Sequence, residues 1–393
     1  MQQIQIAGYK IAEELHSSKK GKVYRADKIT TGEKVILKTL LEYPSVRDIA
    51  RLKKEYEVLQ GIQSQGIIET LGLEKEKQSL ILVLKDTGGV SLNKLLKQRN
   101  FTLGEKIHIA ILLAEAIKNI HHLDIIHLDL KPANIIYNPN SKNLVIIDFG
   151  ISTKLDRENP SIKSPNKIEG TLAYLSPEQT GRMNRCIDYR TDFYSLGITL
   201  YQLFTGGLPF HSKDSMEMIH FHMAVEAERV HLKNSKVPLV LSNIIQKLMS
   251  KQAEERYQGG HGIHYDLQKC QELLQIGKLY PENFKLASQD ISDKFQIPQK
   301  LYGREKEIAK LLSAFANVSE GNSELVIVKG YSGIGKSALV NEIHKSILEK
   351  RGYFIEGKFD QFKRNIPYSA IIIAFQDLVR QILSERGLNI GRH

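Results

Sequence analysis

Cysteine and long hydrophobic runs are both scarce in this sequence. Its two cysteines, Cys186 and Cys270, have no Cys or His companions at the spacing of a metal site, which suits a reducing compartment. The apolar runs, such as residues 80–84, 144–147 and 325–328, fall far short of the roughly 20 residues that a membrane-spanning helix needs. The first ten residues lack the charged start and apolar middle of an export signal. These absences predict a cytoplasmic protein without a membrane span.

Basic residues are spread along the chain, although its 393 residues carry a net charge of +11. They alternate with acids, as in residues 74–77 and 304–307, which is typical of solvated surfaces and not of a phosphate-binding patch. We therefore expect no nucleic-acid partner. A nucleic-acid binder, suggested by the net charge alone, is the last of three hypotheses for the function of the chain. With 41% hydrophobic and 25% charged residues, the composition is that of a globular protein with two domains or three lobes.

The N-terminal part of the chain favours a small sheet interrupted by a helix. Antiparallel strands are expected over residues 4–15, 21–28 and 34–39, with another over 80–84. Between them Ser45 precedes Asp48 by three residues, which resembles a helix-capping box, and apolar residues then recur at helical spacing. Further on, Thr102 and Glu105 cap a long amphipathic helix, and the chain as far as Leu274 is expected to be mostly helical.

A domain boundary is expected where helical periodicity stops. Residues 280–300 carry two prolines and little periodicity, which is typical of a connecting segment. We therefore divide the chain into a first domain at 1–278, a linker at 279–300 and a second domain at 301–393. The second domain shows an α/β order, with a helix over 304–317, a strand over 324–329, a glycine-rich turn and a helix over 336–350.

One run of polar residues carries the chemistry of the first domain. It reads His127-Leu128-Asp129-Leu130-Lys131-Pro132-Ala133-Asn134, and a strand-like stretch then leads to Asp148-Phe149-Gly150. Upstream, Lys38 ends a strand pattern and Glu55 lies on the expected helix. Glu57 is about 200° round that helix from Glu55, so both carboxylates cannot face Lys38. In sequence, order and spacing, these motifs resemble a protein kinase.

The resemblance implies a bilobal α+β fold with a small β-rich N-lobe and a helical C-lobe, and it assigns roles to the motif residues. Asp129 is expected to be the catalytic base and Lys131 to neutralise the γ-phosphate during transfer. Asn134 and Asp148 are expected to hold Mg²⁺. The lysine two residues after Asp129 implies transfer to serine and threonine hydroxyls of protein substrates.

The same resemblance places ATP in the β-rich lobe. Lys38 is expected to grip the α- and β-phosphates, and Glu55 is expected to pair with Lys38. Gly21 and Val23, together with Lys38 and Asp148, are the expected nucleotide contacts.

Motifs further along extend the resemblance over residues 9–274. They are Gly170-Thr171, Ser176-Pro177-Glu178, Asp192 to Gly197, and Arg256. The resemblance implies that the first two end an activation segment, that Asp192 begins a helix bracing the catalytic loop, and that Arg256 pairs with Glu178. For Thr171 it implies bonds to Asp129 and Lys131, and a phosphorylation site is an equal alternative.

The chain departs from the kinase pattern at three places. His16 and Ser18 replace glycines of the phosphate-binding loop, which leaves Gly21 and implies weaker or reshaped nucleotide binding. Leu128 stands where many kinases carry an arginine, so control by a phosphate on the activation loop loses its usual partner. The insert at 180–185 contains two arginines and is either a surface loop or part of substrate recognition.

A second constellation lies in the second domain, where residues 330–337 satisfy the pattern G-x-x-x-x-G-K-[ST] between an expected strand and an expected helix. The pattern indicates a P-loop. Gly330, Gly333 and Gly335 allow backbone N–H groups to surround phosphates, Lys336 is expected to reach the β- and γ-phosphates, and Ser337 to bind Mg²⁺.

Residues 301–307 resemble the opening of the AAA-like signalling ATPases called STAND proteins. We find no strand ending in the acidic residues that hydrolysis requires, and 56 residues follow Ser337, so we expect a partial α/β P-loop NTPase domain without hydrolysis. The pairing resembles large bacterial signalling proteins in which a serine/threonine kinase precedes an ATPase, sensory modules and a histidine kinase. The chain is then the front portion of such a protein or a truncated relative.

Together the motifs predict an ATP- and Mg²⁺-dependent serine/threonine protein kinase of bacterial signal transduction with an attached nucleotide-binding module. Its expected partners are protein substrates bearing serine or threonine, and downstream ATPase, sensor and histidine kinase modules. The alternative, suggested by His16, Ser18 and Leu128, is a catalytically weak or inactive scaffold that binds nucleotide and regulates the ATPase.

Overall fold

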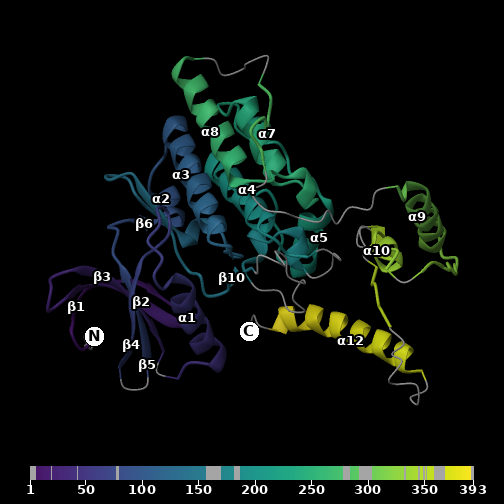
Figure 1. Cartoon of the computed structure of the whole chain (residues 1–393), viewed down its shortest axis with the longest axis horizontal. Coiled ribbons are helices and arrows are strands. Elements are labelled where there is room, and N and C mark those ends of the chain that lie inside the picture. The colour runs from purple at the N-terminus through teal and green to yellow at the C-terminus, as the bar shows by residue number, and fades with distance from the viewer. Residues whose placement is uncertain are drawn as a thin grey trace.

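The first domain has a β-rich lobe followed by a larger helical lobe, and further helices lie toward the C-terminus (Figure 1). The computed structural model describes residues 6–18, 20–41, 43–76, 79–155, 170–180, 186–277, 284–291, 303–331, 333–343, 346–347, 350, 352–357 and 368–390. Within these ranges no helix has the length and apolarity needed to cross a membrane. The predicted order of a small β-rich lobe and a helical lobe is confirmed.

Five antiparallel strands form the sheet of the first lobe, in the order β1-β2-β3-β5-β4. Their bounds are β1 Tyr9–Ser17, β2 Gly21–Lys28, β3 Lys34–Leu40, β4 Thr70–Glu76 and β5 Ser79–Lys85. Apolar side chains alternate along β2 and β3, so that Tyr24, Ala26, Val35 and Leu37 are buried together. The predicted meander is confirmed, and its first strand begins at Tyr9, later than predicted.

Helix α1, Val46–Leu59, lies between β3 and β4 in the chain. The Ser45 hydroxyl accepts a hydrogen bond from the Asp48 amide at 3.1 Å, which caps the helix as the sequence predicts. The apolar side of α1 packs against β4 and β5. Glu55 is buried on that side, whereas Glu57 is exposed, so the helix turns one of the two carboxylates inward.

The helical lobe is arranged around α4, and Figure 1 shows α3, α4, α7 and α8 running side by side. Its helices are α2 Leu92–Gln98, α3 Leu103–His122, α4 Arg190–Thr205, α5 Ser215–Ala224, α6 Val230–Lys233, α7 Leu239–Leu248 and α8 Gly260–Gln275. Of the 16 residues in α4, 14 are buried, which is the mark of a central helix. At the start of α3 the predicted capping box is present between Thr102 and Glu105.

Short elements shape the loops that connect the longer strands and helices. They are β6 Val90–Ser91, β7 Ile125–Ile126, η1 Pro132–Asn134, β8 Ile135–Asn138, β9 Asn143–Ile146, β10 Thr153–Lys154, η2 Leu172–Tyr174, η3 Pro177–Thr180 and η4 Ala253–Glu255, where η denotes a 3₁₀ turn. The hairpin of β8 and β9 continues past its last pair, since the Ile147 amide donates to the Asn134 carbonyl at 2.9 Å. This pairing brings the chain before β8 next to the chain after β9.

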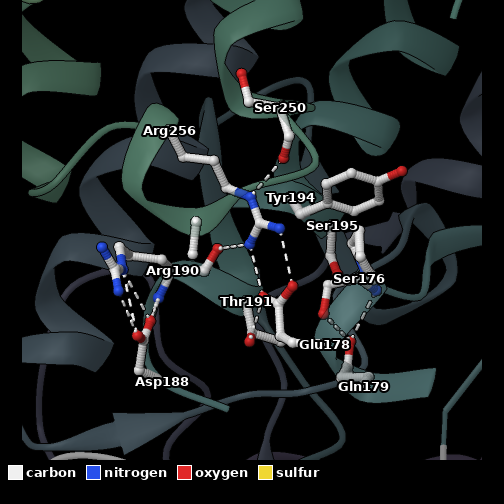
Figure 2. Close-up of polar contacts among 12 residues, drawn as sticks. Ser176, Glu178, Gln179, Asp188, Arg190, Thr191, Tyr194, Ser195, Ser250 and Arg256 are labelled. Carbon is white, nitrogen blue, oxygen red and sulfur yellow. Dashed lines mark hydrogen bonds and ion pairs between the residues drawn. The ribbon is translucent and has the colours of Figure 1, made fainter. Parts of the chain in front are cut away.

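A buried ion pair joins η3 to the loop before α8 (Figure 2). Arg256, which is fully buried, donates through Nη1 and Nη2 to the two carboxylate oxygens of Glu178 at 2.6 and 2.8 Å. Its guanidinium also donates to three backbone carbonyls, and the Thr191 hydroxyl donates to Glu178 at 2.8 Å. Burial alone would raise the pKa of Glu178, but Arg256 holds that pKa below its ordinary value. The pair predicted from the sequence is therefore present and fully hydrogen-bonded.

Residues 284–291 pack on the helical lobe, although their composition predicts that they belong to the linker. The Asp290 carboxylate accepts hydrogen bonds from the amides of Gln258 and Gly259, both at 2.9 Å, immediately before α8 begins. A Cβ atom at Gly262 would lie 2.7–2.9 Å from Asp290, so this close approach requires glycine. The segment packs here because the Asp290 carboxylate supplies acceptors for the amides of the two residues that lead into the helix.

The C-terminal part contains α9 Glu305–Ser319, α10 Lys336–Asn341 and α12 Ser369–Ile390. Helix α9 agrees with the prediction, whereas α10 ends well before residue 350. The predicted strand over 324–329 is wrong for this structure, because no element forms there and the Leu325 and Ile327 side chains are 86% and 69% exposed. A parallel strand requires hydrogen-bonded neighbours, and the described residues provide none for this segment.

Replacing Arg256 by methionine tests the buried ion pair. Arg256→Met leaves a buried carboxylate without its partner, so we expect the free energy of unfolding to fall by about 3–5 kcal/mol. Lys269→Met removes an exposed pair with Glu272 and is expected to cost less than about 1 kcal/mol. Urea unfolding at pH 7 compares the two variants, and equal midpoints would contradict the prediction.

The pH dependence of the same pair has a definite sign. Because the folded-state pKa of Glu178 is lowered, the pair stabilises the fold above the carboxyl's unfolded pKa and loses that contribution as pH falls through the folded pKa. The stability difference between the wild type and Glu178→Gln is therefore expected to narrow on acidification. Urea midpoints from pH 7 to pH 4 measure it, and a constant difference would count against the sign.

Replacing Asp290 by alanine tests the packed segment. The variant leaves two amides at the start of α8 without their charged acceptor, so we expect a loss of about 1–3 kcal/mol of unfolding free energy. Gln289→Ala, at an exposed neighbouring position, is the matched control and is expected to change stability by less than about 0.5 kcal/mol. Thermal unfolding of the full chain compares the two, and an unaffected Asp290→Ala would show that the segment does not stabilise the lobe.

Candidate active site

Asp129, Lys131 and Asn134 converge in the loop between β7 and β8. Lys131 Nζ lies 2.5 Å from Asp129 Oδ2, and Asn134 Nδ2 lies 3.2 Å from the same oxygen. Asn134 Nδ2 also donates to the Asp129 carbonyl at 2.9 Å, so the turn at η1 folds the loop back on itself. The structure thus brings these three predicted site residues together around one carboxylate.

Thr171 closes the other side of the Asp129 carboxylate. Its amide and its hydroxyl both donate to Asp129 Oδ1 at 3.0 Å, and Lys131 Nζ donates to Thr171 Oγ1 at 2.6 Å. Gly170 has a φ of +97°, and a Cβ atom there would lie 3.3 Å from the Leu128 carbonyl oxygen, so a side chain is disfavoured. The predicted contacts of Thr171 with Asp129 and Lys131 are confirmed.

Lys38 on β3 lies between two carboxylates from different elements. Its Nζ is 2.6 Å from Glu55 Oε2 on α1 and 2.8 Å from Asp148 Oδ1. Glu55 is 1% exposed, whereas the Asp148 side chain is 43% exposed and remains open to a ligand. The trio therefore links the sheet, the helix α1 and the loop after β9 through a single ammonium group.

The charges of the trio determine which groups are ionised. Burial alone would lower the pKa of Lys38, but the negative charges of Glu55 and Asp148 raise it above its ordinary value. Loss of water contact alone would raise the pKa of Asp148, but Lys38 lowers it to about 2. Burial raises the pKa of Glu55, which Lys38 offsets only in part. An ionised Asp148 beside a charged Lys38 is the arrangement that a triphosphate with its cation requires.

Asp192, at the start of α4, holds the loop that carries Asp129. Its carboxylate accepts hydrogen bonds from the amides of His127 and Leu128 at 2.8 and 2.9 Å, and His121 Nε2 lies 2.9 Å from Oδ2. Burial alone would raise the pKa of Asp192, and these partners hold it below its ordinary value. The bracing role predicted for the start of α4 is confirmed. The contact of His121 was missed, because its position in the sequence indicates only the end of α3.

Two residues of the site adopt left-handed backbone conformations that side chains disfavour. Leu128 has a φ of +67° and Asp148 a φ of +70°. Such conformations cost on the order of 1–3 kcal/mol each and persist where surrounding contacts hold them. Phe149, fully buried, packs edge-on against His127 with ring centroids 4.8 Å apart, and His127 Nε2 lies 3.0 Å from the Ile147 carbonyl. These contacts hold the backbone on both sides of Asp148.

The turn between β1 and β2 differs from the expected phosphate-binding arrangement. The Ser18 hydroxyl donates to the Gly21 carbonyl at 3.1 Å and accepts from the Gly21 amide at 3.3 Å, so it closes its own turn. A Cβ atom at Gly21 would lie 2.2 Å from the Thr39 carbonyl, so packing against β3 itself requires this glycine. Val23 pairs in register with Lys38, which places both expected nucleotide contacts on neighbouring strands.

A divalent cation fits the oxygen groups beside Asp129. Because Asn134 turns Nδ2 toward Asp129, its carbonyl oxygen is the atom left for a ligand, and Asp148 supplies a partly exposed, ionised carboxylate. Carbonyl and carboxylate oxygens are the donors that Mg²⁺ prefers. Among the described residues no cluster of three or more His, Cys, Asp or Glu side chains forms a metal site of its own.

The P-loop residues lie in the C-terminal part. Gly333 and Gly335 have φ values of +82° and +92°, which only glycine adopts readily. Lys336 Nζ donates to the carbonyls of Gly330 and Tyr331 at 2.8 and 2.7 Å, across the loop that it is predicted to share with phosphates. Ser337 is exposed at the start of α10.

Residues 181–185, most of the predicted insert, lie outside the described part of the chain.

Comparison with known proteins agrees with this geometry. The family model for the protein kinase domain matches residues 9–269, and the model for the AAA ATPase domain matches residues 300–392. The chain is 40% identical over 233 residues to hybrid signal transduction histidine kinase G of Dictyostelium discoideum, covering 54% of this chain and 7% of that protein. It is 31% identical over 225 residues to a probable serine/threonine-protein kinase of Clostridium perfringens, covering 57% of this chain and 32% of that protein.

A further probable serine/threonine-protein kinase, from Clostridium acetobutylicum, is 29% identical over 259 residues, or 65% of this chain and 38% of that protein. The chain therefore spans between 7% and 38% of the length of these three relatives. The kinase model covers more than half of the chain and includes every residue of the Asp129 and Lys38 clusters. The chain belongs to the protein kinase family, and an AAA ATPase domain follows its kinase domain.

Proposed function

We propose that the chain transfers the γ-phosphoryl group of ATP to serine or threonine hydroxyls of protein substrates. The observation that carries the proposal is the Asp129 carboxylate, held by Lys131, Asn134 and Thr171 within 2.5–3.2 Å. A carboxylate so oriented can accept a proton from a hydroxyl placed against it. The serine/threonine-protein kinase names of two relatives agree with this substrate class.

In the proposed reaction the substrate oxygen attacks the γ-phosphorus while its proton passes to Asp129. The bond from the γ-phosphorus to the bridging oxygen of ADP breaks, and ADP leaves with that electron pair. Lys131, 2.5 Å from Asp129, lies where it can neutralise charge on the transferred group. Lys38, oriented by Glu55, holds the α- and β-phosphates, and Gly21 and Val23 contact the nucleotide from β2.

Asn134 and Asp148 are the residues proposed to hold Mg²⁺, which would neutralise the phosphate oxygens when bound. Asp148 remains ionised across the physiological pH range, since Lys38 lowers its pKa to about 2.

We also propose that the chain consists of two domains with different functions. The kinase domain occupies residues 1–278, with 284–291 packed against it, and a P-loop domain occupies 301–393. In the second domain Gly330, Gly333, Gly335, Lys336 and Ser337 bind nucleotide phosphates, with Ser337 on Mg²⁺. Further ATPase, sensor and histidine kinase modules are the partners proposed for this chain, and the similarity to a hybrid signal transduction histidine kinase supports the last of these.

Replacing Asp129 tests the proposed reaction. Asp129→Asn removes the proton acceptor and keeps the shape, so we expect phosphoryl transfer to fall by about 10²–10⁴-fold. Lys336→Ala, in the P-loop, is expected to leave transfer unchanged. Transfer from γ-labelled ATP to the chain itself and to casein measures both. Equal labelling by the wild type and Asp129→Asn would contradict the proposal, and no labelling by any of the three would favour the nucleotide-binding scaffold.

The orientation of Lys38 is tested by a matched pair of substitutions on α1. Glu55→Gln removes the buried charge that holds Lys38, so we expect kcat/KM for ATP to fall by roughly tenfold to a hundredfold. Glu57→Gln, the same change two residues along on the exposed side, is expected to stay within about twofold of the wild type. Steady-state kinetics over a range of ATP concentrations compares them, and similar losses in both variants would rule out a specific role for Glu55.

A further inference from the structure

Gln179 is a buried side chain that the proposed reaction does not use. It lies in η3, is 4% exposed, and makes three hydrogen bonds (Figure 2 shows those to Ser176). Its Oε1 accepts from the Ser176 amide and hydroxyl at 3.0 and 3.1 Å. Its Nε2 donates to the Leu128 carbonyl at 2.9 Å. Two donors on one side and an acceptor on the other determine which way the amide faces.

The carbonyl that Gln179 contacts belongs to the residue just before Asp129. Leu128 has a φ of +67°, so its backbone depends on external contacts to keep that conformation. Its amide donates to Asp192 Oδ1 at 2.9 Å, and its carbonyl accepts from Gln179. Asp192 therefore holds one end of this peptide segment and Gln179 holds the other.

Gln179 also belongs to a segment that contacts the catalytic loop twice. Thr171, at its start, bonds directly to Asp129, and Gln179, eight residues later, bonds to Leu128. The segment in turn is anchored to α4 and the loop before α8, because Glu178 pairs with Arg256 and accepts from Thr191. A rigid anchor next to Gln179 means that its amide holds the Leu128 carbonyl in one place.

We propose that Gln179 is a positioning residue, which transmits the docking of residues 171–180 to the orientation of the Asp129 carboxylate. The inference rests on the proposed kinase function and deepens it. The link consists of neutral hydrogen bonds, which suits a chain with Leu128 where an arginine would carry charge. Gln179 thus supplies a constitutive contact between the segment 171–180 and the peptide that precedes Asp129.

The test uses Gln179→Glu, because the new carboxyl group can donate a hydrogen bond to the Leu128 carbonyl only when it is protonated. Gln179→Glu retains the acceptor for Ser176 but, when ionised, turns a carboxylate oxygen toward the Leu128 carbonyl. At pH 8 we expect kcat to fall by about tenfold to a hundredfold with KM for ATP within about twofold, since the ATP contacts of Lys38 are untouched. Burial raises the pKa of a carboxyl, so acidification protonates Glu and restores the donor. The ratio of variant to wild-type kcat is therefore expected to rise between pH 8 and pH 5.5.

Gln258→Glu is the matched control. Gln258 donates through Nε2 to the carbonyls of Ala253, Glu254 and Arg256, so the change turns a carboxylate oxygen toward backbone carbonyls in a different loop. Its other oxygen keeps the Arg190 guanidinium as a donor, at 2.8 Å from Gln258 Oε1 in the wild type. Its kcat ratio to wild type is expected to stay flat with pH. A Gln179→Glu variant that is folded yet keeps full kcat at pH 8, or whose ratio ignores pH as the control does, would overturn the proposal.

A second variant, Gln179→Met, covers the case in which Gln179→Glu does not fold. Gln179→Met has the same length and no charge; if Gln179→Glu fails to fold, a reduced kcat in Gln179→Met with unchanged KM for ATP supports the role, and an unchanged kcat overturns it. Hydrogen exchange of the backbone amides over 127–131 is measured on the same full-length samples. Faster exchange in the Gln179 variants than in Gln258→Glu supports the link between Gln179 and the loop before Asp129. This holds even if the wild type transfers no phosphate, because the absence of transfer would count against the proposed function and not against the link. Unchanged exchange overturns the link.

Discussion

The buried carboxylate of Asp192 is the constraint on which the site depends. It lies in the first turn of a helix that is buried on nearly all sides, where the helix N-terminus favours negative charge. From there it accepts hydrogen bonds from the amides of His127 and Leu128, two consecutive residues of the loop that carries Asp129. Leu128 has a left-handed backbone conformation. Without an acceptor at this point those amides would be buried and unpaired, and the loop would relax to a conformation that points Asp129 elsewhere.

The rest of the site is built outward from that helix. Glu178 and Arg256 anchor the segment that carries Thr171 and Gln179, and the segment reaches over the loop to Asp129. Burying an ion pair is costly unless every donor and acceptor is satisfied, and here the guanidinium contacts the carboxylate through two nitrogens and three carbonyls through its remaining donors. Such a pair contributes a defined geometry, which catalysis requires more than it requires extra stability.

Lys38 performs the matching task in the β-rich lobe. One ammonium group satisfies a carboxylate from α1 and another from the loop after β9, so three elements that are distant in sequence are held at one point. Asp148 keeps an exposed face while Glu55 is enclosed, which separates a carboxylate that can meet a ligand from one that serves the lysine. The periodicity of α1 already indicates that Glu55 and Glu57 cannot both face Lys38, and in the fold Glu55 is the one turned inward.

Much of this could be predicted from local patterns. The strands β2, β3 and β5 and the caps of α1 and α3 follow from alternation and capping pairs, since each depends on neighbours a few residues apart. The residues of the Asp129 and Lys38 clusters follow from the resemblance of their ordered motifs to those of protein kinases. Gln179, His121 and Asp290 could not be predicted, because a glutamine, a histidine or an aspartate in a polar stretch carries no local sign of its distant partner. The strand expected over 324–329 was wrong for a related reason: an apolar run predicts a strand only if a sheet exists to pair with it.

Residue type and local spacing specify which chemical groups this protein can use and the order in which they occur, because both are read directly from the chain. Only the packed fold specifies what holds the strained peptide before Asp129, and that the hydroxyl of Ser18 closes its own turn. Those outcomes depend on distances between residues far apart in the chain, and such distances arise only when the helices and strands pack and exclude water.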